Sequence, residues 1–290
     1  MTEFVHGILR TTSPHRAAVE ARLIMAGVQS FEERDESIDP NLVGRVEFHL
    51  YAEVDDEGEL SAQIAAADLA GLLTEPPQLQ HEEGVDWAEA WKIHYQPLRL
   101  SPRITVVPSW VQYESDDDER VIVLDPGTAF GTGQHETTAL CVQALDLRAS
   151  EAAIGRFADI GTGTGILALA ADRLGARSLW LTENDPMALA VAQENLAGVV
   201  AAFELCERPR SEESYDTVVA NILAEPLMGM AADLAALLAP KGALFLSGLL
   251  SSQAKAVEAA FLASGLRTVR QWNQGAWSLL WMVRSGDDVS

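Results

Sequence analysis

The strongest constraint on the fold is a strand that runs directly into a glycine-rich turn and then a helix, FADIGTGTGILALA at residues 157–170. From about residue 120 the hydrophobic pattern alternates between strand and helix periods, which is typical of a doubly wound α/β sheet. We expect strands at 157–160, 178–183, 201–206, 215–222 and 243–249, and helices at about 164–174, 186–197, 226–238 and 252–264.

The end of the chain breaks this alternation. Residues 266–272 and 277–284 are two strand candidates joined by NQGA, with no helix between them. A hairpin at the edge of a parallel sheet makes one strand antiparallel. This feature distinguishes the methyltransferase version of the fold from the dinucleotide-binding version. We therefore predict a class I methyltransferase, Rossmann-like sheet with an antiparallel C-terminal hairpin strand.

The glycine turn predicts the kind of ligand. Dinucleotide-binding proteins carry G-x-G-x-x-G, but the third glycine is missing here, because Ile166 follows Gly165. A G-x-G-x-G turn preceded by Asp159 suits a sulfonium nucleoside, which has no pyrophosphate to place at the helix N-terminus. Gly161 and Gly163 are then predicted cofactor contacts, since glycine lets the backbone pass close to a ligand. A purely structural strand-to-helix turn is the alternative.

An acidic residue ends the next strand. Glu183 stands 22 positions after Gly161, where a carboxylate accepts hydrogen bonds from both ribose hydroxyls. An ionised acceptor makes the stronger, charge-assisted bond. Asp185 instead reads as the N-cap of the following helix, with Pro186 at its first position.

Asn221 ends the fourth strand, in YDTVVANILAEP, at the edge where open α/β sheets bind ligands. A structural cap is the alternative role for this amide. Methyltransferases often carry Asn/Asp-Pro-Pro-aromatic at this place, which holds a planar amide or aromatic nitrogen. Ile222 and Leu223 replace that pattern here, so the sequence favours an aliphatic amine as the acceptor.

A second glycine-rich element, LDPGTAFGTGQHETTAL, covers residues 124–140. Its glycines are Gly127, Gly131 and Gly133, and the pair Thr137-Thr138 is expected to cap a helix over 139–146. The element is either a flexible connector or a loop that folds over the cofactor.

In the second interpretation Phe130 is an apolar lid and Thr138 contacts the methionine part of the cofactor. His135 is a candidate base, although a single loop histidine is usually polar surface. Phe130, His135 and Asn221 are therefore candidate catalytic residues, and no residue is assigned as the general base.

The first 85 residues have a different pattern, in the order strand, helix, strand, strand, helix and then a further strand candidate. Ser13 and Pro14 predict a helix start, and Val46, Phe48 and Leu50 share one face of a strand within 43–54. This order predicts a small α+β, ferredoxin-like domain. It carries no catalytic constellation, so we interpret it as a docking or spacer module.

Three segments follow from these patterns: the α+β domain over 1–85, a linker helix and hairpin over 86–110, and a methyltransferase domain over 111–290. In the linker, Trp87 and Trp91 lie four positions apart, which favours packing on one helical face.

Charge and composition exclude several classes of protein. The formal net charge is −23, and residues 1–85 hold 17 acidic and 5 basic side chains. Such a surface repels phosphate backbones, so we expect no direct nucleic-acid binding and a basic partner instead, with plain solvation as the alternative. No apolar run is long enough for a bilayer span, and the start lacks an export signal. Two cysteines are too few for a disulfide framework or a cysteine zinc site, and we predict no metal site. We expect a soluble, cytoplasmic protein without membrane association.

Residues 86–285 resemble PrmA, the family that methylates amines on the stalk-base protein of the large ribosomal subunit, large-subunit protein eleven. The resemblance rests on DWAEAWK, VPSW, LDPGTAFGTGQHETTAL, DIGTGTGILALA, NDP, VVANILAEPL and LSGLL, in the order and spacing of the family. Two positions depart from it. The turn reads GTGTG where the family often has G-C-G-S-G, and Glu183 stands where aspartate is common.

The resemblance implies a cofactor, a substrate and a set of contacts. The cofactor is S-adenosylmethionine, and its carried-over contacts are Thr138, Gly161, Glu183 and Asn221. Residues 1–85 resemble the family's substrate-recognition domain in size and in the order of strands and helices. The implied activity is N-methylation of lysine side-chain and/or N-terminal α-amines of a basic ribosomal protein. A lysine methyltransferase for another protein, a small-molecule amine methyltransferase and a non-catalytic nucleotide-binding protein remain the alternatives.

Overall fold

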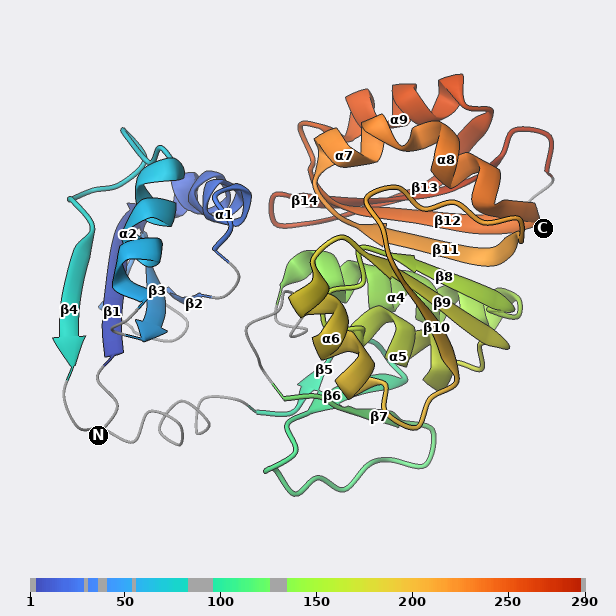
Figure 1. The fold of residues 1–290 in the computed structure, drawn as a ribbon, viewed down its shortest axis with the longest axis horizontal. Helices are drawn as coiled ribbons and strands as arrows, with labels where there is room; N and C mark the ends of the chain where they lie inside the picture. Colours follow the sequence, from blue (N-terminus) through green and yellow to red (C-terminus); the bar gives the residue numbers. More distant parts are fainter. Residues whose placement is uncertain are drawn as a thin grey trace. The chain divides into compact units, whose positions relative to one another are not determined.

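The computed structural model describes residues 4–28, 31–35, 41–53, 56–82, 96–125 and 135–287. These residues belong to two compact units, 1–95 and 96–290 (Figure 1). The domain boundaries at 85 and 110 stay predictions, and Trp87 and Trp91 lie outside the described residues. Among the helices of the described residues, none has both the length and the apolar character needed to cross a bilayer.

The first unit is an antiparallel sheet with the strand order β2-β3-β1-β4. Two helices connect these strands in the predicted split βαβ, ferredoxin-like order (Figure 1). The elements are β1 (Phe4–Thr12), the 3₁₀ turn η1 (Ser13–His15), α1 (Arg16–Met25), β2 (Glu32–Arg34), β3 (Arg45–Glu53), α2 (Glu57–Ala66) and β4 (Gln78–Glu82).

One face of this sheet forms the core of the first unit. Val46, Phe48 and Leu50 are at most 1% exposed and pack in one cluster with Val19 and Leu23 of α1, as the period-two pattern predicts. Complete burial of each large apolar side chain contributes about 2–3 kcal/mol.

The start of α1 differs from the prediction. Ser13 is not the N-cap, because Ser13–His15 forms a 3₁₀ turn flanked by Thr12 and the α-helix begins only at Arg16. The amphipathic pattern predicts a second helix over 59–73 that ends before Pro76, but α2 already ends at Ala66. Asp68 has a left-handed φ of 47°, which ends the helical conformation well before Pro76 and Pro77.

The second unit begins with a small sheet of order β5-β6-β7. The first two strands form the predicted antiparallel hairpin, and the third pairs in parallel with the second. Arg103, in the turn, donates from its backbone nitrogen at 3.2 Å and from Nε at 2.5 Å to the buried Asp146 carboxylate on α4. The elements are β5 (Leu98–Arg99), β6 (Ile104–Val107), β7 (Arg120–Val123) and α4 (Glu136–Glu151).

A seven-stranded sheet of order β10-β9-β8-β11-β12-β14-β13 forms the body of the second unit. Its strands pair in parallel except for β14, which is antiparallel to both of its neighbours. This arrangement confirms the predicted methyltransferase version of the doubly wound sheet. The strands are β8 (Arg156–Ile160), β9 (Ser178–Glu183), β10 (Ala201–Leu205), β11 (Tyr215–Asn221), β12 (Leu238–Leu250), β13 (Leu266–Gln274) and β14 (Trp277–Arg284).

Helices cover both faces of this sheet, with α4, α5 and α6 on one side and α7, α8 and α9 on the other (Figure 1). The helix expected over 226–238 is divided at Met230, directly after Gly229, which is a poor helix former. The remaining helices are α5 (Ile166–Arg173), α6 (Pro186–Asn195), α7 (Ala224–Gly229), α8 (Ala231–Leu237) and α9 (Ala254–Ala263).

Candidate functional site

The strand register brings three predicted site residues to one level of the sheet. Ile160 of β8 is opposite Thr182 of β9 and opposite Ala220 of β11. The residues that follow these three in the chain are Gly161, Glu183 and Asn221. Because β8 lies between β9 and β11, these residues form one row at the carboxyl edge, where open α/β sheets bind ligands.

The glycine turn between β8 and α5 has a backbone that few side chains permit. Gly161, Gly163 and Gly165 have φ values of 73°, 54° and 81°. The amides of Gly161 and Thr162 both donate to the carbonyl oxygen of Thr182, at 2.9 and 3.0 Å. The turn is therefore bound to the end of the neighbouring strand, and its left-handed positions explain the glycines.

Glu183 binds this turn with its side chain. Its Oε2 accepts from the amide of Gly163 at 2.9 Å, and its Oε1 accepts from the amide of Asn184 at 2.8 Å. The residue is 9% exposed. Oε1 also accepts from the amide of Asp185 at 3.4 Å, whereas Oε2 has a further lone pair. A ribose contact at Oε2 is therefore compatible with these bonds. The structure thus gives Glu183 an additional role, which is to hold the glycine turn.

Asp185 and Pro186 start α6 as predicted. The amide of Met187 donates to Asp185 Oδ1 at 2.8 Å, and Pro186 is the first helical residue.

Asp159 is a candidate that the sequence prediction did not include among the site residues. It precedes Ile160 on β8, is fully buried, and accepts from the hydroxyl of Thr162 at 2.8 Å. Burial, opposed by the hydrogen bond from the Thr162 hydroxyl and assisted by the charge of the Glu183 carboxylate, raises the pKa of this carboxyl to about 7. An acidic residue one position before the end of a buried strand is the sequence signal that identifies it.

Three oxygen atoms around the row have unused hydrogen-bonding capacity. Thr138 Oγ1, Asp159 Oδ1 and Asn221 Oδ1 are buried, and none has a hydrogen-bond partner among the described residues. Buried polar atoms are normally paired, so unpaired ones indicate a place where a ligand or water completes the bonds. Thr138 is the third residue of α4. The carbonyl oxygen of the preceding residue, Thr137, accepts from the hydroxyl of Ser247 on β12 at 3.4 Å.

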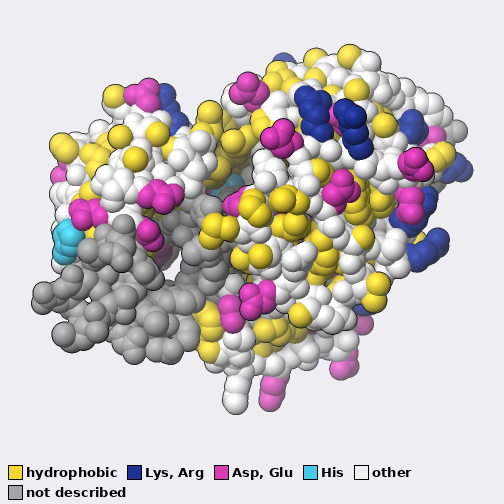
Figure 2. Space-filling model, in the orientation of Figure 1, with side chains coloured by type: hydrophobic (Ala, Val, Ile, Leu, Met, Phe, Trp, Pro, Cys, Tyr) yellow, Lys and Arg dark blue, Asp and Glu magenta, His cyan; other side chains and the backbone are white. Residues whose placement is uncertain are grey.

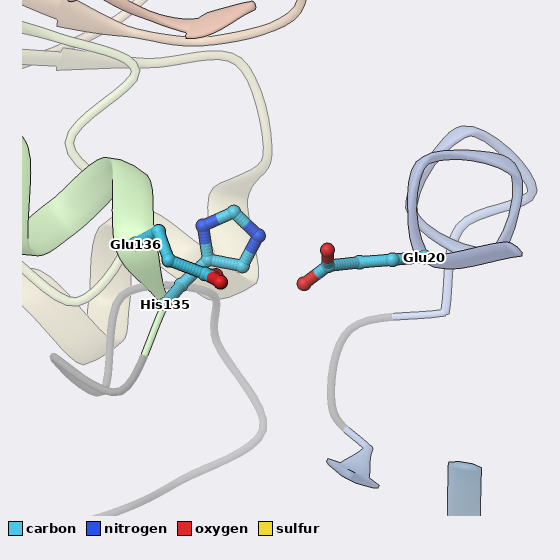
Figure 3. A group of neighbouring side chains, drawn as sticks. All are labelled: Glu20, His135 and Glu136. Atoms are coloured by element: carbon cyan, nitrogen blue, oxygen red, sulfur yellow. The ribbon is translucent and has the colours of Figure 1, made fainter. Parts of the chain in front are cut away.

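The start of α4 corrects the predicted cap. Thr137 and Thr138 are not the cap, because the helix begins at Glu136 and His135 is its N-cap residue. The Nδ1 atom of His135 accepts from the amide of Thr137 at 3.2 Å, and its ring contacts Trp277 edge-on. Figure 3 shows the side chains of His135 and Glu136 at this first turn. The geometry favours a structural role for His135 over a catalytic one.

The glycine-rich element before α4 is only partly described. Phe130, Gly127, Gly131 and Gly133 lie outside the described residues, and their predicted roles stay predictions. Asp125, at the start of the element, accepts from the backbone nitrogen of Ser109 at 2.6 Å and from its hydroxyl at 2.7 Å. These bonds join the VPSW and LDP segments that carry the family resemblance.

The chain matches known proteins over most of its length. The family model described as ribosomal protein L11 methyltransferase (PrmA) matches residues 2–285. A relative from Geobacter metallireducens, named ribosomal protein L11 methyltransferase, is 42% identical over 207 residues, which are 71% of this chain and 68% of the relative. A relative of the same name from Streptococcus uberis is 38% identical over 242 residues, 80% of this chain and 74% of the relative.

A solved structure is similar as well. The crystal structure of a ribosomal protein L11 methylase from Lactobacillus delbrueckii subsp. bulgaricus is 33% identical, with a TM-score of 0.61. The match covers 66% of this chain and 99% of the solved chain. These matches confirm the predicted fold class and the predicted cofactor, S-adenosylmethionine. With a family model that spans residues 2–285, the chain belongs to the PrmA family of methyltransferases.

Proposed function

We propose that this chain is an S-adenosylmethionine-dependent protein N-methyltransferase of the cytoplasm. Its proposed substrate is ribosomal protein L11, on lysine side-chain and/or N-terminal α-amines. The observation that supports the proposal best is the row of Gly161, Glu183 and Asn221 across β8, β9 and β11, in a chain of the PrmA family.

The side chains around the row fit the cofactor. Two of the three unused atoms, Asp159 Oδ1 and Asn221 Oδ1, are acceptors, and the third belongs to the hydroxyl of Thr138. S-adenosylmethionine carries an ammonium group, ribose hydroxyls and an adenine amine, which are all donors. When bound, it supplies a methyl group activated by a positively charged sulfur.

We propose a distinct role for each residue of the row. Gly161 and Gly163 let the backbone pass beside the ligand, and Glu183 holds this turn while it accepts from the ribose hydroxyls. Asn221 orients the ligand or the acceptor amine through its side-chain carbonyl oxygen, which has no hydrogen-bond partner in the described part of the chain. These residues position the reactants, and positioning alone reaches effective molarities of about 10⁵ M or more.

The acceptor nitrogen has to be neutral, although a lysine amine has a pKa of about 10.4 in water. Desolvation lowers this pKa, whereas nearby carboxylates raise it. We therefore propose that most of the acidic excess acts away from the reacting nitrogen and attracts the basic substrate. Figure 2 shows carboxylates spread over the visible face of the molecule, with no single concentration of them. The acceptor amine can lose its proton to water before it enters the site, and we assign no general base.

We further propose that residues 1–85 dock the substrate, because this segment has 17 acidic and 5 basic side chains and lacks a catalytic constellation. A variant that lacks residues 1–85 should then bind S-adenosylhomocysteine like the full chain but should not methylate protein. Loss of cofactor binding together with activity would contradict this division of roles.

Mass spectrometry with isotope-labelled S-adenosylmethionine tests the substrate. Purified ribosomal protein L11, a second basic ribosomal protein and small aliphatic amines are incubated separately with the full chain. We expect label on lysine or α-amino nitrogens of ribosomal protein L11 alone. Label on the other ribosomal protein, or on the small amines, would replace the proposed substrate by the corresponding alternative.

A further inference from the structure

Ile222, the residue after Asn221, lies between two glycines that come from different parts of the sheet. A Cβ atom added to Gly161 would lie 2.5 Å from Cγ2 of Ile222. A Cβ atom added to Gly248 would fall on the main chain of Ile222, 2.7 Å from its carbonyl carbon and 2.9 Å from its nitrogen. Real Cβ atoms do not approach other atoms this closely, so both contacts require glycine.

The strand topology explains the contact with Gly248. Asn221 and Ser247 are the last paired residues of β11 and β12, so Ile222 and Gly248 follow them side by side. The pairing of β12 with β14 shifts its register between Leu246 and Leu249. Gly248 lies in this irregularity with a φ of 79°. Bulges of this kind redirect the chain beside functional sites, and here the redirected chain makes room for the peptide of Ile222.

Packing at Ile222 confines the main chain next to Asn221. The Oδ1 atom of Asn221 has no hydrogen-bond partner among the described residues, so no such bond sets the orientation of that oxygen. The main chain next to it is confined by Gly248, and the side chain of Ile222 contacts the first residue of the glycine turn. The position of Asn221 is thereby coupled to the position of Gly161.

From this geometry we infer that Ile222 is a positioning residue, which sets Asn221 at a fixed place relative to the glycine turn. The inference rests on the proposed function. The contact with Gly161 uses Cγ2, one of the two carbons attached to Cβ, and β-branched side chains have few χ1 rotamers. Valine keeps both carbons on Cβ, leucine keeps one, and alanine keeps neither. The side chain therefore has to be β-branched, and apolar character alone is insufficient.

Steady-state kinetics separates positioning from stability. In Ile222→Ala we expect kcat to fall about 10- to 100-fold. The KM for the acceptor should change less than about threefold, and the Kd for S-adenosylhomocysteine should rise at most about fivefold, which corresponds to one weakened hydrogen bond. Ile222→Val should restore kcat to within about threefold of the original, and Ile222→Leu should not restore it. The matched control is Ile154→Ala, which removes a buried isoleucine just before β8, at the opposite edge of the same sheet. It should lower the unfolding midpoint at least as much and leave kcat per folded molecule unchanged.

Two kinetic results would overturn the inference: equal kcat values in Ile222→Ala and Ile154→Ala, or a valine variant as impaired as the alanine variant. A second readout does not depend on activity. In protein saturated with S-adenosylhomocysteine, the ¹H–¹⁵N signals of the Asn221 side-chain amide should coincide in the original chain, Ile222→Val and Ile154→Ala, and should move in Ile222→Ala. Unchanged signals in Ile222→Ala would refute positioning by Ile222. An inactive original chain with the expected signals would instead refute only the proposed function.

Discussion

Thr138 and Thr217 provide a matched pair for testing the site. Both are fully buried threonines of the second unit. The hydroxyl of Thr138 has no partner among the described residues, whereas that of Thr217 donates to the carbonyl oxygen of Ile154 at 2.8 Å. Thr217 is near the start of β11 and Thr138 is in the first turn of α4, so only Thr138 belongs to the candidate site.

Replacement of each threonine by valine should give opposite results. An unpaired buried hydroxyl costs about 1–3 kcal/mol, so Thr138→Val should leave the free energy of unfolding unchanged or raise it by about 1 kcal/mol. Thr217→Val leaves a buried carbonyl unpaired and should lower the free energy of unfolding by about 1–3 kcal/mol. For cofactor affinity we expect the opposite: the Thr138 variant should be the impaired one. Loss of one hydrogen bond worth about 1 kcal/mol should weaken binding to Thr138→Val about fivefold, while Thr217→Val should bind normally.

Urea unfolding and calorimetric titration with S-adenosylhomocysteine measure the two quantities on the same preparations. If both variants lose stability alike, the hydroxyl of Thr138 is paired in solution and the reasoning from unused hydrogen bonds is wrong. The same conclusion holds if Thr138→Val binds the cofactor as tightly as the original chain.

Three further predictions concern carboxyl and imidazole groups. Glu183→Gln should weaken cofactor binding about tenfold or more in calorimetric titration, because an NH₂ group replaces one accepting oxygen. For the same reason hydrogen exchange at the Gly163 amide should become faster, and an unchanged exchange rate would refute the role of Glu183 in holding the glycine turn. Because burial raises the folded-state pKa of Asp159 from 3.8 to about 7, the unfolded chain loses this proton at lower pH than the folded chain does. The free energy of unfolding should therefore fall as the pH rises from about 4 to 7. Asp159→Asn should remove this part of the pH dependence in urea unfolding, and an unchanged pH dependence would contradict the prediction. Burial, with the charges of Arg34 and His6, lowers the pKa of His49 below 6.5, so its contribution to stability is present above about pH 6.5 and is lost on acidification. His49→Gln should reduce the acid destabilisation of the first unit, followed by the backbone amide signals of β3 in ¹H–¹⁵N spectra, and equal acid sensitivity would refute this.

The sequence predicts the row of site residues because each member follows a buried apolar strand. The runs before Gly161, Glu183 and Asn221 are too short and too rich in β-branched and aromatic residues for helices, and parallel strands end at a common edge. The antiparallel pairing of β13 with β14 follows from the final hairpin, which has no room for a crossover helix.

Other features depend on tertiary contacts that no local pattern specifies. The strand β12 begins at Leu238, five residues before the predicted start. The apolar residues Leu238 and Ala239 fit the end of the preceding helix as well as the start of a strand, so the sequence does not locate this boundary. Histidine is an unusual N-cap residue, so the sequence favours Thr137 and Thr138 over His135 as the cap of α4. Neither the unpaired oxygen of Asp159 nor the position of Ile222 between two glycines can be read from spacing.

Calorimetric titration of the full chain with S-adenosylhomocysteine and, separately, with NAD tests the central claim most directly. The row of Gly161, Glu183 and Asn221 predicts saturable binding of S-adenosylhomocysteine at one site and no measurable binding of NAD. Saturable binding of NAD, or no heat from S-adenosylhomocysteine, would contradict the assignment of this sheet edge as an adenosyl site.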